Sequence, residues 1–271
     1  MKIILLSPLV IVVISFLVFK VFWRPSNDRD WELDQALLPF AEIDGSLVSI
    51  HNIRNFSYNS TTDYTVSYYD KTYDISKLKN VYYIVEPFST FAGSAHTFVS
   101  FEFEGNDFLA ISVEIRKEKG EKFSAWKGMF NQYEMMYVIA DERDVVKLRT
   151  NYRKDKVYMY PTKASLEKKK ALFLDMVGKA NLLREHPEFY NTLTNTCTTK
   201  IVSHVNKISP KRIPFSYKVL LPGYSDRLAY DLGLLDTELS FEEARDKFLI
   251  NEKAEKYAAD KNFPVLIRGE N

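Results

Sequence analysis

Hydrophobic and polar residues alternate along much of the chain between about residue 35 and residue 160, a pattern typical of β-strands that bury one face. The segment 47–54 alternates cleanly, and 80–88 is rich in β-branched and aromatic residues. On this basis we predict strands at 47–54, 80–88, 96–103, 108–116, 134–140, 145–149 and 157–161. The four charged residues at 141–144 are expected to form a solvated turn between two strands.

Apolar residues recur at helical spacing in the rest of the chain. The spacing predicts a helix from Lys163 to Glu185, with Pro187 just beyond its end. A second helix is expected from Cys197 to about Ile208, and Ser240 with Glu243 resembles a capping box that opens a third over 241–259. No change of composition separates the strands from the helices. The sequence therefore predicts one α+β domain, with an antiparallel sheet first and helices after.

The hairpin 96–116 has a register that its two faces determine. If Phe103 faces Asp107 across the three-residue loop 104–106, the pairing places an almost wholly apolar set on one face. A two-residue loop mixes polar and apolar residues on both faces. Three-residue loops need a left-handed third residue, which Asn106 tolerates. This register sets Glu114 opposite His96, with Ser112 on the same face.

The amino terminus carries a long apolar run. Residues 3–19 contain no charge, and at roughly 1.5 Å per residue they nearly span a hydrocarbon core of about 30 Å. We predict a membrane anchor over 1–23, a polar linker over 24–34 and a domain over 35–271. A cleaved signal peptide is the alternative, but the flank 19–31 offers no small-x-small cleavage site. Positive charges on both sides leave the orientation open.

Composition narrows the function classes. Lys and Arg (37) nearly cancel Asp and Glu (36), so nothing indicates nucleic acid or an acidic substrate as a partner. The four histidines lack metal-ligand spacing and no glycine-rich phosphate loop is present, so neither a metal nor a cofactor is expected. The single cysteine excludes an internal disulfide and is either a packed side chain or a nucleophile.

Cys197 follows a run of helix-capping residues, 191–196, and precedes an apolar-periodic stretch. This places it at or next to the first turn of a helix, where unpaired N–H groups and the helix dipole favour a thiolate and can donate to an oxyanion. A buried structural cysteine is the alternative. We expect Asn195, Thr196, Thr198 and Ser112 to lie in the vicinity of the substrate or of an oxyanion.

A thiol nucleophile needs a base, and four histidines are available. His186 lies in a helix-ending turn, His51 lies on an early strand, and His204 is two helical turns away from Cys197. His96 opens a strand after a small-residue loop that lets a substrate approach. Glu114 opposite it would orient the imidazole, although pairing with an arginine such as Arg116 or Arg143 is the structural alternative.

Several stretches resemble a known family, the Lnb N-terminal periplasmic domain. They are EIDGSLVSIHNIRNFSY, YYDKTYDISKLKNV, AHTFVSFEF, AISVEIRKEKGEKFS, YVIADERDVVKLRTNY, FYNTLTNTCTTKI and GYSDRLAYDLGLLDT, and together they cover roughly residues 30–265. The resemblance implies a periplasmic domain, hence a single-pass bacterial inner-membrane protein. It also implies a papain-like fold of the NlpC/P60 kind in circularly permuted order, with the histidine strand before the cysteine helix.

The same resemblance implies acyl chemistry. Lnb is a lipoprotein N-acyltransferase thought to act through a cysteine thioester, which makes Cys197 the nucleophile, His96 the general base and Glu114 the orienting residue. Family members usually have Asn directly before the cysteine, whereas this chain has Thr196 there and Asn195 one place earlier. Lnb-type acyltransferases also carry further membrane helices after this domain, and this sequence shows no second apolar run. The fold is therefore implied more directly than the reaction.

The expected function is that of a membrane-anchored, thiol-dependent acyltransferase or hydrolase acting on lipids or lipoproteins through a Cys197 thioester. A cysteine peptidase or amidase acting on peptidoglycan peptides is the second possibility, and a non-catalytic envelope-binding module is the third. An apolar groove beside Cys197 would favour the lipid substrate, and an open polar groove the peptide. A Cys197 that is buried, or that lies more than about 5 Å from His96, would favour the binding module.

Overall fold

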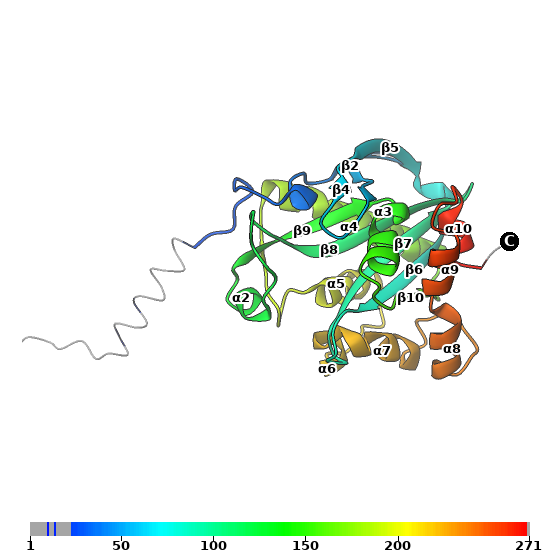
Figure 1. The fold of residues 1–271 in the computed structure, drawn as a ribbon. Helices are drawn as coiled ribbons and strands as arrows, with labels where there is room; N and C mark the ends of the chain where they lie inside the picture. The colour runs from blue at the N-terminus through cyan, green and yellow to red at the C-terminus, as the bar shows by residue number, and fades with distance from the viewer. Residues whose placement is uncertain (1–9, 11–13, 15–22, 270–271) are drawn as a thin grey trace, which may run out of the picture.

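Strands fill the first half of the chain and helices the second, as the hydrophobic pattern predicts (Figure 1). The computed structural model describes residues 10, 14 and 23–269. Its strands are β1 (Phe40–Asp44), β2 (Leu47–Arg54), β3 (Ser57–Tyr58), β4 (Tyr64–Thr65), β5 (Tyr68–Asp74), β6 (Leu78–Pro87), β7 (Ala95–Phe103), β8 (Asp107–Arg116), β9 (Tyr133–Ala140), β10 (Tyr158–Pro161) and β11 (Phe189–Tyr190).

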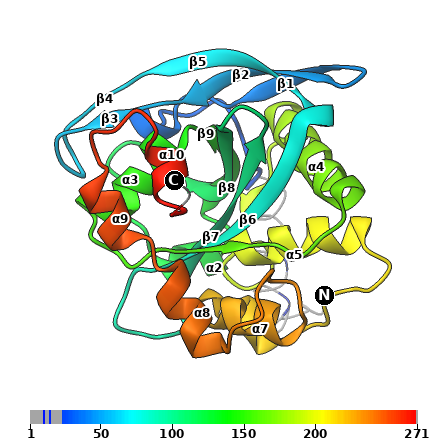
Figure 2. The same cartoon turned by 90° about the vertical axis from the view of Figure 1, so that its right-hand side faces the viewer.

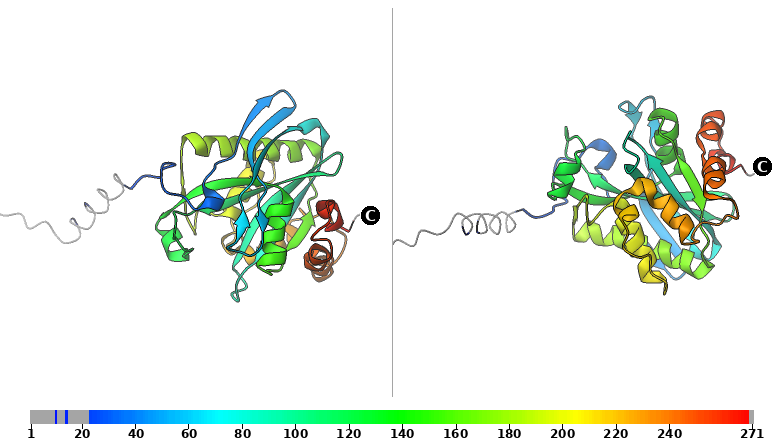
Figure 3. Two further views of the ribbon diagram at one scale, coloured as in Figure 1. Left: turned by 45° about the horizontal axis from the view of Figure 1, so that its top comes forward. Right: turned by 90° about the horizontal axis from the view of Figure 1, so that it is seen from below.

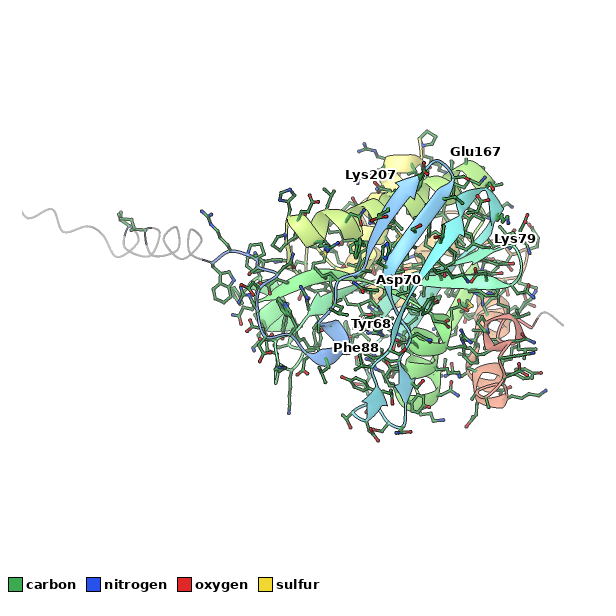
Figure 4. The ribbon with its side chains drawn as sticks, turned by 90° about the horizontal axis from the view of Figure 1, so that it is seen from above. Tyr68, Asp70, Lys79, Phe88, Glu167 and Lys207 are labelled. Carbon is green, nitrogen blue, oxygen red and sulfur yellow. The ribbon has the colours of Figure 1, made fainter. Side chains whose placement is uncertain are left out.

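One large sheet organises the described part of the chain. Its strand order is β1-β2-β9-β8-β7-β6-β10, with β5 on β2 and β11 on β9, while β3 and β4 form a separate small ribbon. Neighbours pair antiparallel except β2 and β9, which are parallel through Arg54 and Ala140. Figure 4 looks down on the β2–β5 side, where Tyr68 and Asp70 lie on β5. Asp70 accepts from His51 of β2 at 2.8 Å between Oδ2 and Nδ1.

Helices cover both faces of the sheet (Figure 2). The α-helices are α2 (Ala125–Met129), α3 (Glu142–Lys147), α4 (Leu166–Glu185), α5 (Cys197–Ile208), α6 (Tyr217–Leu220), α7 (Ser225–Asp231), α8 (Phe241–Phe248), α9 (Asn251–Lys256) and α10 (Phe263–Leu266). One core lies under α4 and α5, and a second lies under α3, α9 and α10. Because both faces are covered, β6 to β9 are buried along almost their whole length.

The hairpin register follows the prediction. Phe103 pairs with Asp107, Phe101 with Leu109 and Val99 with Ile111. Asn106 takes the left-handed conformation, with φ of 60°, that a three-residue loop requires. Phe101, Leu109 and Ile111 face the α4–α5 core, while Phe98 and Ala110 face the other. The predicted separation of the two faces is confirmed.

Two segments differ from their predicted structure on the α3 side. Residues 145–149 are not a strand, because Asp141 caps a helix through Arg143 N and starts α3, which continues as the π-helix η3 (Leu148–Tyr152). The charges at 141–144 are not a solvated turn either. Glu142 and Asp144 are fully buried and pair with Arg268 and Arg54.

The helices of the second half agree with the pattern at two places and differ at a third. The structure has α4 to Glu185 and α5 over Cys197–Ile208, as predicted. The capping box of Ser240 and Glu243 is present, but the single helix over 241–259 is wrong. Its interruption has a clear cause, since Ile250 N donates to Val157 O at 3.0 Å and Leu249 bridges Tyr158 at the sheet edge.

The stretch 24–34 lies against the domain. The indole of Trp31 is buried, and the Arg29 Nη2 atom lies 2.9 Å from Glu134 Oε1. Just before it, Trp23 Nε1 donates to Asn131 O at 2.9 Å, and α2 lies beside this end of the chain (Figure 3). The predicted membrane anchor falls on residues outside those described, apart from residues 10, 14 and 23. Within the described part, no helix combines the length and apolarity needed to cross a bilayer.

We predict that Asp144→Ala lowers the free energy of unfolding by about 3–5 kcal/mol, because it leaves the buried Arg54 guanidinium without its carboxylate. Urea denaturation of the full chain measures the change. Glu255→Ala is the matched control, because Glu255 pairs with Lys154 on the surface, and about 0–1 kcal/mol is expected. A loss below about 1 kcal/mol for Asp144→Ala would contradict the expectation.

Candidate functional site

Cys197 is the first residue of α5, as the capping pattern predicts. Thr196 is the N-cap: its Oγ1 accepts from Thr199 N at 3.2 Å, and its N donates to Thr199 Oγ1 at 2.7 Å. Asn195 Nδ2 donates to Phe189 O at 2.7 Å and fixes the preceding turn. Asn195 and Thr196 therefore shape the start of the helix, and this local chemistry sets the position of the thiol.

The surroundings of Cys197 are hydroxyl groups and apolar side chains. The thiol is 4% exposed and belongs to the α4–α5 core, with its Sγ 3.8 Å from Thr198 Oγ1. Thr198 Oγ1 lies 2.9 Å from Thr97 Oγ1 of β7. Nearby, Tyr83 OH donates to Ser225 Oγ at 2.7 Å, and burial raises the pKa of Tyr83 well above its usual range. Within the described part of the chain, none of these groups around Cys197 is a basic side chain.

His96 lies in a second cluster, with Ser112 and Glu114. Its Nε2 is 2.7 Å from Ser112 Oγ, and Ser112 Oγ donates to Glu114 Oε1 at 2.9 Å. A serine hydroxyl has one proton, so Nε2 is the donor to Ser112 and Nδ1 keeps the free lone pair. The Nε2–Glu114 Oε1 distance is 3.8 Å. Glu114 thus orients His96 through Ser112, in the position that the hairpin register predicts.

The charge of this cluster is set by Arg149 of η3. Its Nη2 donates to Glu114 Oε1 at 2.9 Å and its Nε to Glu86 Oε2 at 2.6 Å. Burial alone would raise the pKa of Glu114, but the charges of Arg149, His96 and Arg54 and the hydrogen bond from Ser112 together outweigh burial and hold this pKa well below its usual range. Burial, and then Arg149, lower the pKa of His96 to about 4, so the imidazole is neutral near pH 7. The arginine partner of Glu114 is Arg149, not Arg116 or Arg143.

The sheet separates the two clusters. Successive residues of a strand point to opposite faces. Thr97 contacts Thr198 on the α5 side, so His96 points to the other face, where it stacks 5.8 Å from Phe98. The Cys197–His96 pair predicted from the sequence is therefore not formed in this structure. His96, Ser112 and Glu114 come together, and Cys197, Thr196 and Thr198 come together, on opposite sides of β7.

A pocket opens beside the thiol cluster. Its volume is about 160 Å³, and its lining is predominantly apolar. The lining comes mainly from β6, α4, α5, α6 and α7 and includes three lysines: Val81, Tyr83, Leu172, Thr198, Ile201, Val202, Val205, Ile213, Val219, Leu228, Ala229, Lys163, Lys168 and Lys169. Thr198 belongs to this lining and is the chain neighbour of Cys197. The pocket lies between the sheet and α4, α5 and α7, which supply most of its lining residues.

Sequence reasoning missed Arg149 and Glu86, and a signal for both existed. Glu86 is an isolated charge in the apolar run 80–88 and is fully buried, which requires a cation such as Arg149 inside the fold. His204 is held by Asp175, 2.5 Å from its Nδ1, and by Tyr137, 2.6 Å from its Nε2. Among the described residues no group of His, Cys, Asp or Glu is arranged to hold a metal ion.

Comparison with known proteins gives one match. The family model described as the Lnb N-terminal periplasmic domain matches residues 64–223, more than half of the chain. The matched range contains β4 to α6 and both clusters, with all of α5. No curated protein and no solved structure matches the chain.

The depressed pKa of His96 predicts a pH dependence of stability. In the unfolded chain a histidine has a pKa of about 6.5, whereas in the fold it is about 4. Between these values the unfolded state binds more protons, so the free energy of unfolding falls as pH drops from about 6.5 to about 4. Urea unfolding of the full chain across pH 4–7 measures this.

His96→Gln is the informative variant, because it removes the titrating group and keeps a polar side chain. In this variant the fall in the free energy of unfolding between pH 6.5 and pH 4 should be smaller than in the unsubstituted protein, by up to about 3 kcal/mol. His186→Gln, at a site outside both clusters, should leave the profile unchanged. Parallel pH profiles for the unsubstituted chain and His96→Gln would show that His96 is not held neutral.

Proposed function

The chain belongs to the Lnb N-terminal periplasmic domain family, and on that premise we propose that it binds the acyl chain of a lipid or lipoprotein in the pocket beside Cys197. The predominantly apolar lining of this pocket is the observation that carries the proposal. A peptidoglycan peptide would need a groove rich in polar partners for its amide groups, so the peptidase alternative has less support.

The size of the pocket suits part of an acyl chain. An apolar cavity of about 150 Å³ holds a molecule the size of benzene, and this one measures about 160 Å³. A few methylene groups would fill it, each contributing about 0.8 kcal/mol on leaving water. The lysines among the lining residues suit the polar end of such a ligand. Lys169 is held in place, since its Nζ donates to Asn80 Oδ1 at 3.0 Å.

Acyl transfer through a thioester is the second candidate, favoured by the position of Cys197 at the start of α5, next in sequence to the pocket residue Thr198. The Cys197 thiol would lose its proton to water, its sulfur would attack the ester carbonyl carbon, a C–S bond would form as the C–O bond breaks, and the leaving alkoxide would take a proton back from water. Water or an amine would then release the acyl group. Backbone N–H groups at the start of α5, with Thr196 and Thr198, would face the oxyanion.

Acyl binding has stronger support than turnover. The base role expected of His96 requires it to reach Cys197, and the two side chains lie on opposite faces of β7. Cys197 is also buried. Both observations are those expected of a non-catalytic envelope-binding module, here one whose ligand is an acyl chain.

Location and fold follow the same premise. We propose a single-pass inner-membrane protein whose apolar residues 3–22 hold the domain at the periplasmic surface, where acylated substrates occur. A circularly permuted papain-like fold is supported by the chain order, in which the strand of His96 precedes the helix of Cys197, and by the packing of α5 on β7 and β8. The orientation of His96 away from α5 departs from that arrangement.

Photo-crosslinking tests the pocket. With the full chain in lipid vesicles that contain a diazirine-bearing acyl lipid, we expect crosslinks on α5 and α7 by peptide mass spectrometry. Val202→Phe should reduce them at least several-fold, because the ring occupies pocket volume. Ser203→Phe is the matched control, since Ser203 is exposed on the same helix and outside the lining. Equal crosslinking in both variants would contradict an acyl pocket.

Intact-protein mass spectrometry tests the thioester. After incubation with a diacylated lipopeptide, acyl transfer predicts an acyl-sized mass gain that hydroxylamine removes and that Cys197→Ala abolishes. Acyl binding alone predicts no adduct, with the crosslinks of the preceding experiment retained in Cys197→Ala. An adduct that persists in Cys197→Ala would count against Cys197 as the acceptor.

A further inference from the structure

An exposed aromatic segment, residues 210–218, lies at the mouth of the pocket. Ile213 and Val219 both line the pocket, so the residues between them cross its edge. Phe215 is 87% exposed and Tyr217 is 60% exposed. Large aromatic side chains with this exposure leave apolar area in water, which a soluble surface ordinarily avoids when the residues cluster.

The segment is held in this position by hydrogen bonds. Ile213 N donates to Asn206 Oδ1 at 2.7 Å, and Asn206 Nδ2 donates to Ile213 O at 3.2 Å. At the other end Ser216 caps α6 through Lys218 N. The aromatic side chains are thus presented by a segment anchored on both sides.

A second aromatic loop, residues 88–94, contacts residues 221 and 223, which follow this segment in the chain. Phe88 and Phe91 are 45% and 56% exposed. Gly223 N donates to Gly93 O at 3.1 Å, and a Cβ on Gly223 would lie 1.9 Å from Ala92 O, so only glycine permits this approach. In Figure 1 the connection from β6 to β7 accordingly reaches the lower side of the molecule at α6.

The charge beside these rings is positive. Lys211 and Arg212 are exposed, and within the described part of the chain no acidic side chain pairs with either. The neighbouring lysines are neutralised, Lys207 by Asp175 and Lys218 by Asp231. Two free cations next to exposed aromatic rings match the interfacial region of an anionic bilayer, where aromatic residues and Lys or Arg are favoured.

We propose that segment 210–218 and loop 88–94 form a docking surface for an anionic lipid bilayer, through which an acyl chain passes into the pocket. The role in acyl entry rests on the proposed function, whereas the docking itself does not. The bilayer is the occupant that the free cations and the adjacent apolar pocket favour over a protein partner.

Depth measurement tests the docking. The full chain carrying Cys197→Ala and Phe215→Cys, spin-labelled at 215, is placed in vesicles of phosphatidylcholine with phosphatidylglycerol. We expect oxygen accessibility at 215 to rise, and accessibility to a water-soluble nickel complex to fall, several-fold relative to detergent-free nanodiscs of phosphatidylcholine alone. The control label replaces Thr61, which is exposed in the β3–β4 turn and belongs to neither segment of the proposed surface.

The docking is tested a second time by substituting the two unpaired cations, Lys211 and Arg212. Lys211→Gln with Arg212→Gln should weaken docking on anionic vesicles about thirty-fold, from two charges near a charged surface, without shifting the thermal midpoint. Position 215 as water-exposed as position 61 on anionic vesicles would overturn the proposal. If the surface instead binds a second copy of this chain or another protein, position 215 would stay water-exposed in vesicles that contain lipid alone.

Photo-crosslinking separates the two proposals. If the label at position 215 enters the bilayer but no crosslinks form on α5 and α7, the docking surface is supported and the acyl pocket is refuted. Crosslinks in the pocket that are equal for Phe215→Ser and the unsubstituted chain, with no docking at 215, would sustain the pocket and refute this surface.

Discussion

The alternation of side chains along β7 is the constraint on which the rest of the structure depends. The strand lies inside the sheet with helices on both faces, so each of its residues is committed to one core or the other. Thr97 meets α5 and His96 meets η3. A shift of one residue would exchange them, but it would also move Phe101 and Phe103 out of the α4–α5 core. The apolar residues of the hairpin therefore determine which chemistry lies on which side.

The two faces have become chemically distinct environments. The α3 side holds fully buried carboxylates, and each is matched by an arginine: Glu86 by Arg149, Glu142 by Arg268 and Asp144 by Arg54. Such pairs are costly to break, because a single partner left behind is a buried charge. The α5 side has hydroxyls, aliphatic and aromatic side chains and the pocket, and its buried His204 and Asp226 are hydrogen-bonded to Tyr137 and Tyr160. An acyl chain would lose little on entering the second environment and could not enter the first.

The parts of the fold that follow from local chemistry could be predicted from the sequence. The register of the hairpin follows from its apolar face, and the start of α5 from the capping residues before Cys197. The β-branched Val145 and Val146 favour a strand over 145–149, but the helix cap at Asp141 outweighs that propensity. The prediction of one continuous helix over 241–259 is wrong because the backbone of Leu249 and Ile250 pairs with the edge of the sheet, a tertiary contact that the local pattern does not show.

The predicted pairing of Cys197 with His96 is the part of the site that the structure does not show. The sequence shows that each lies at the end of an element, and the resemblance to the family pairs them, but neither indicates which face of the sheet α5 covers. That choice depends on the apolar residues of α5, which pack with Val99 rather than Phe98.

The pocket gives the strongest reason to place function on the α5 side. The pocket of about 160 Å³ leaves apolar side chains of the sheet and of α5 and α7 along its wall rather than packed against one another, which lowers the free energy of unfolding. Larger side chains at Ala229 or Val202 would remove that cost, and the domain otherwise packs its interior densely, with fully buried Phe173, Met176 and Val177 next to the same helices. The proposed acyl binding rests on this apolar space, whose lining begins one residue after the chain's single cysteine.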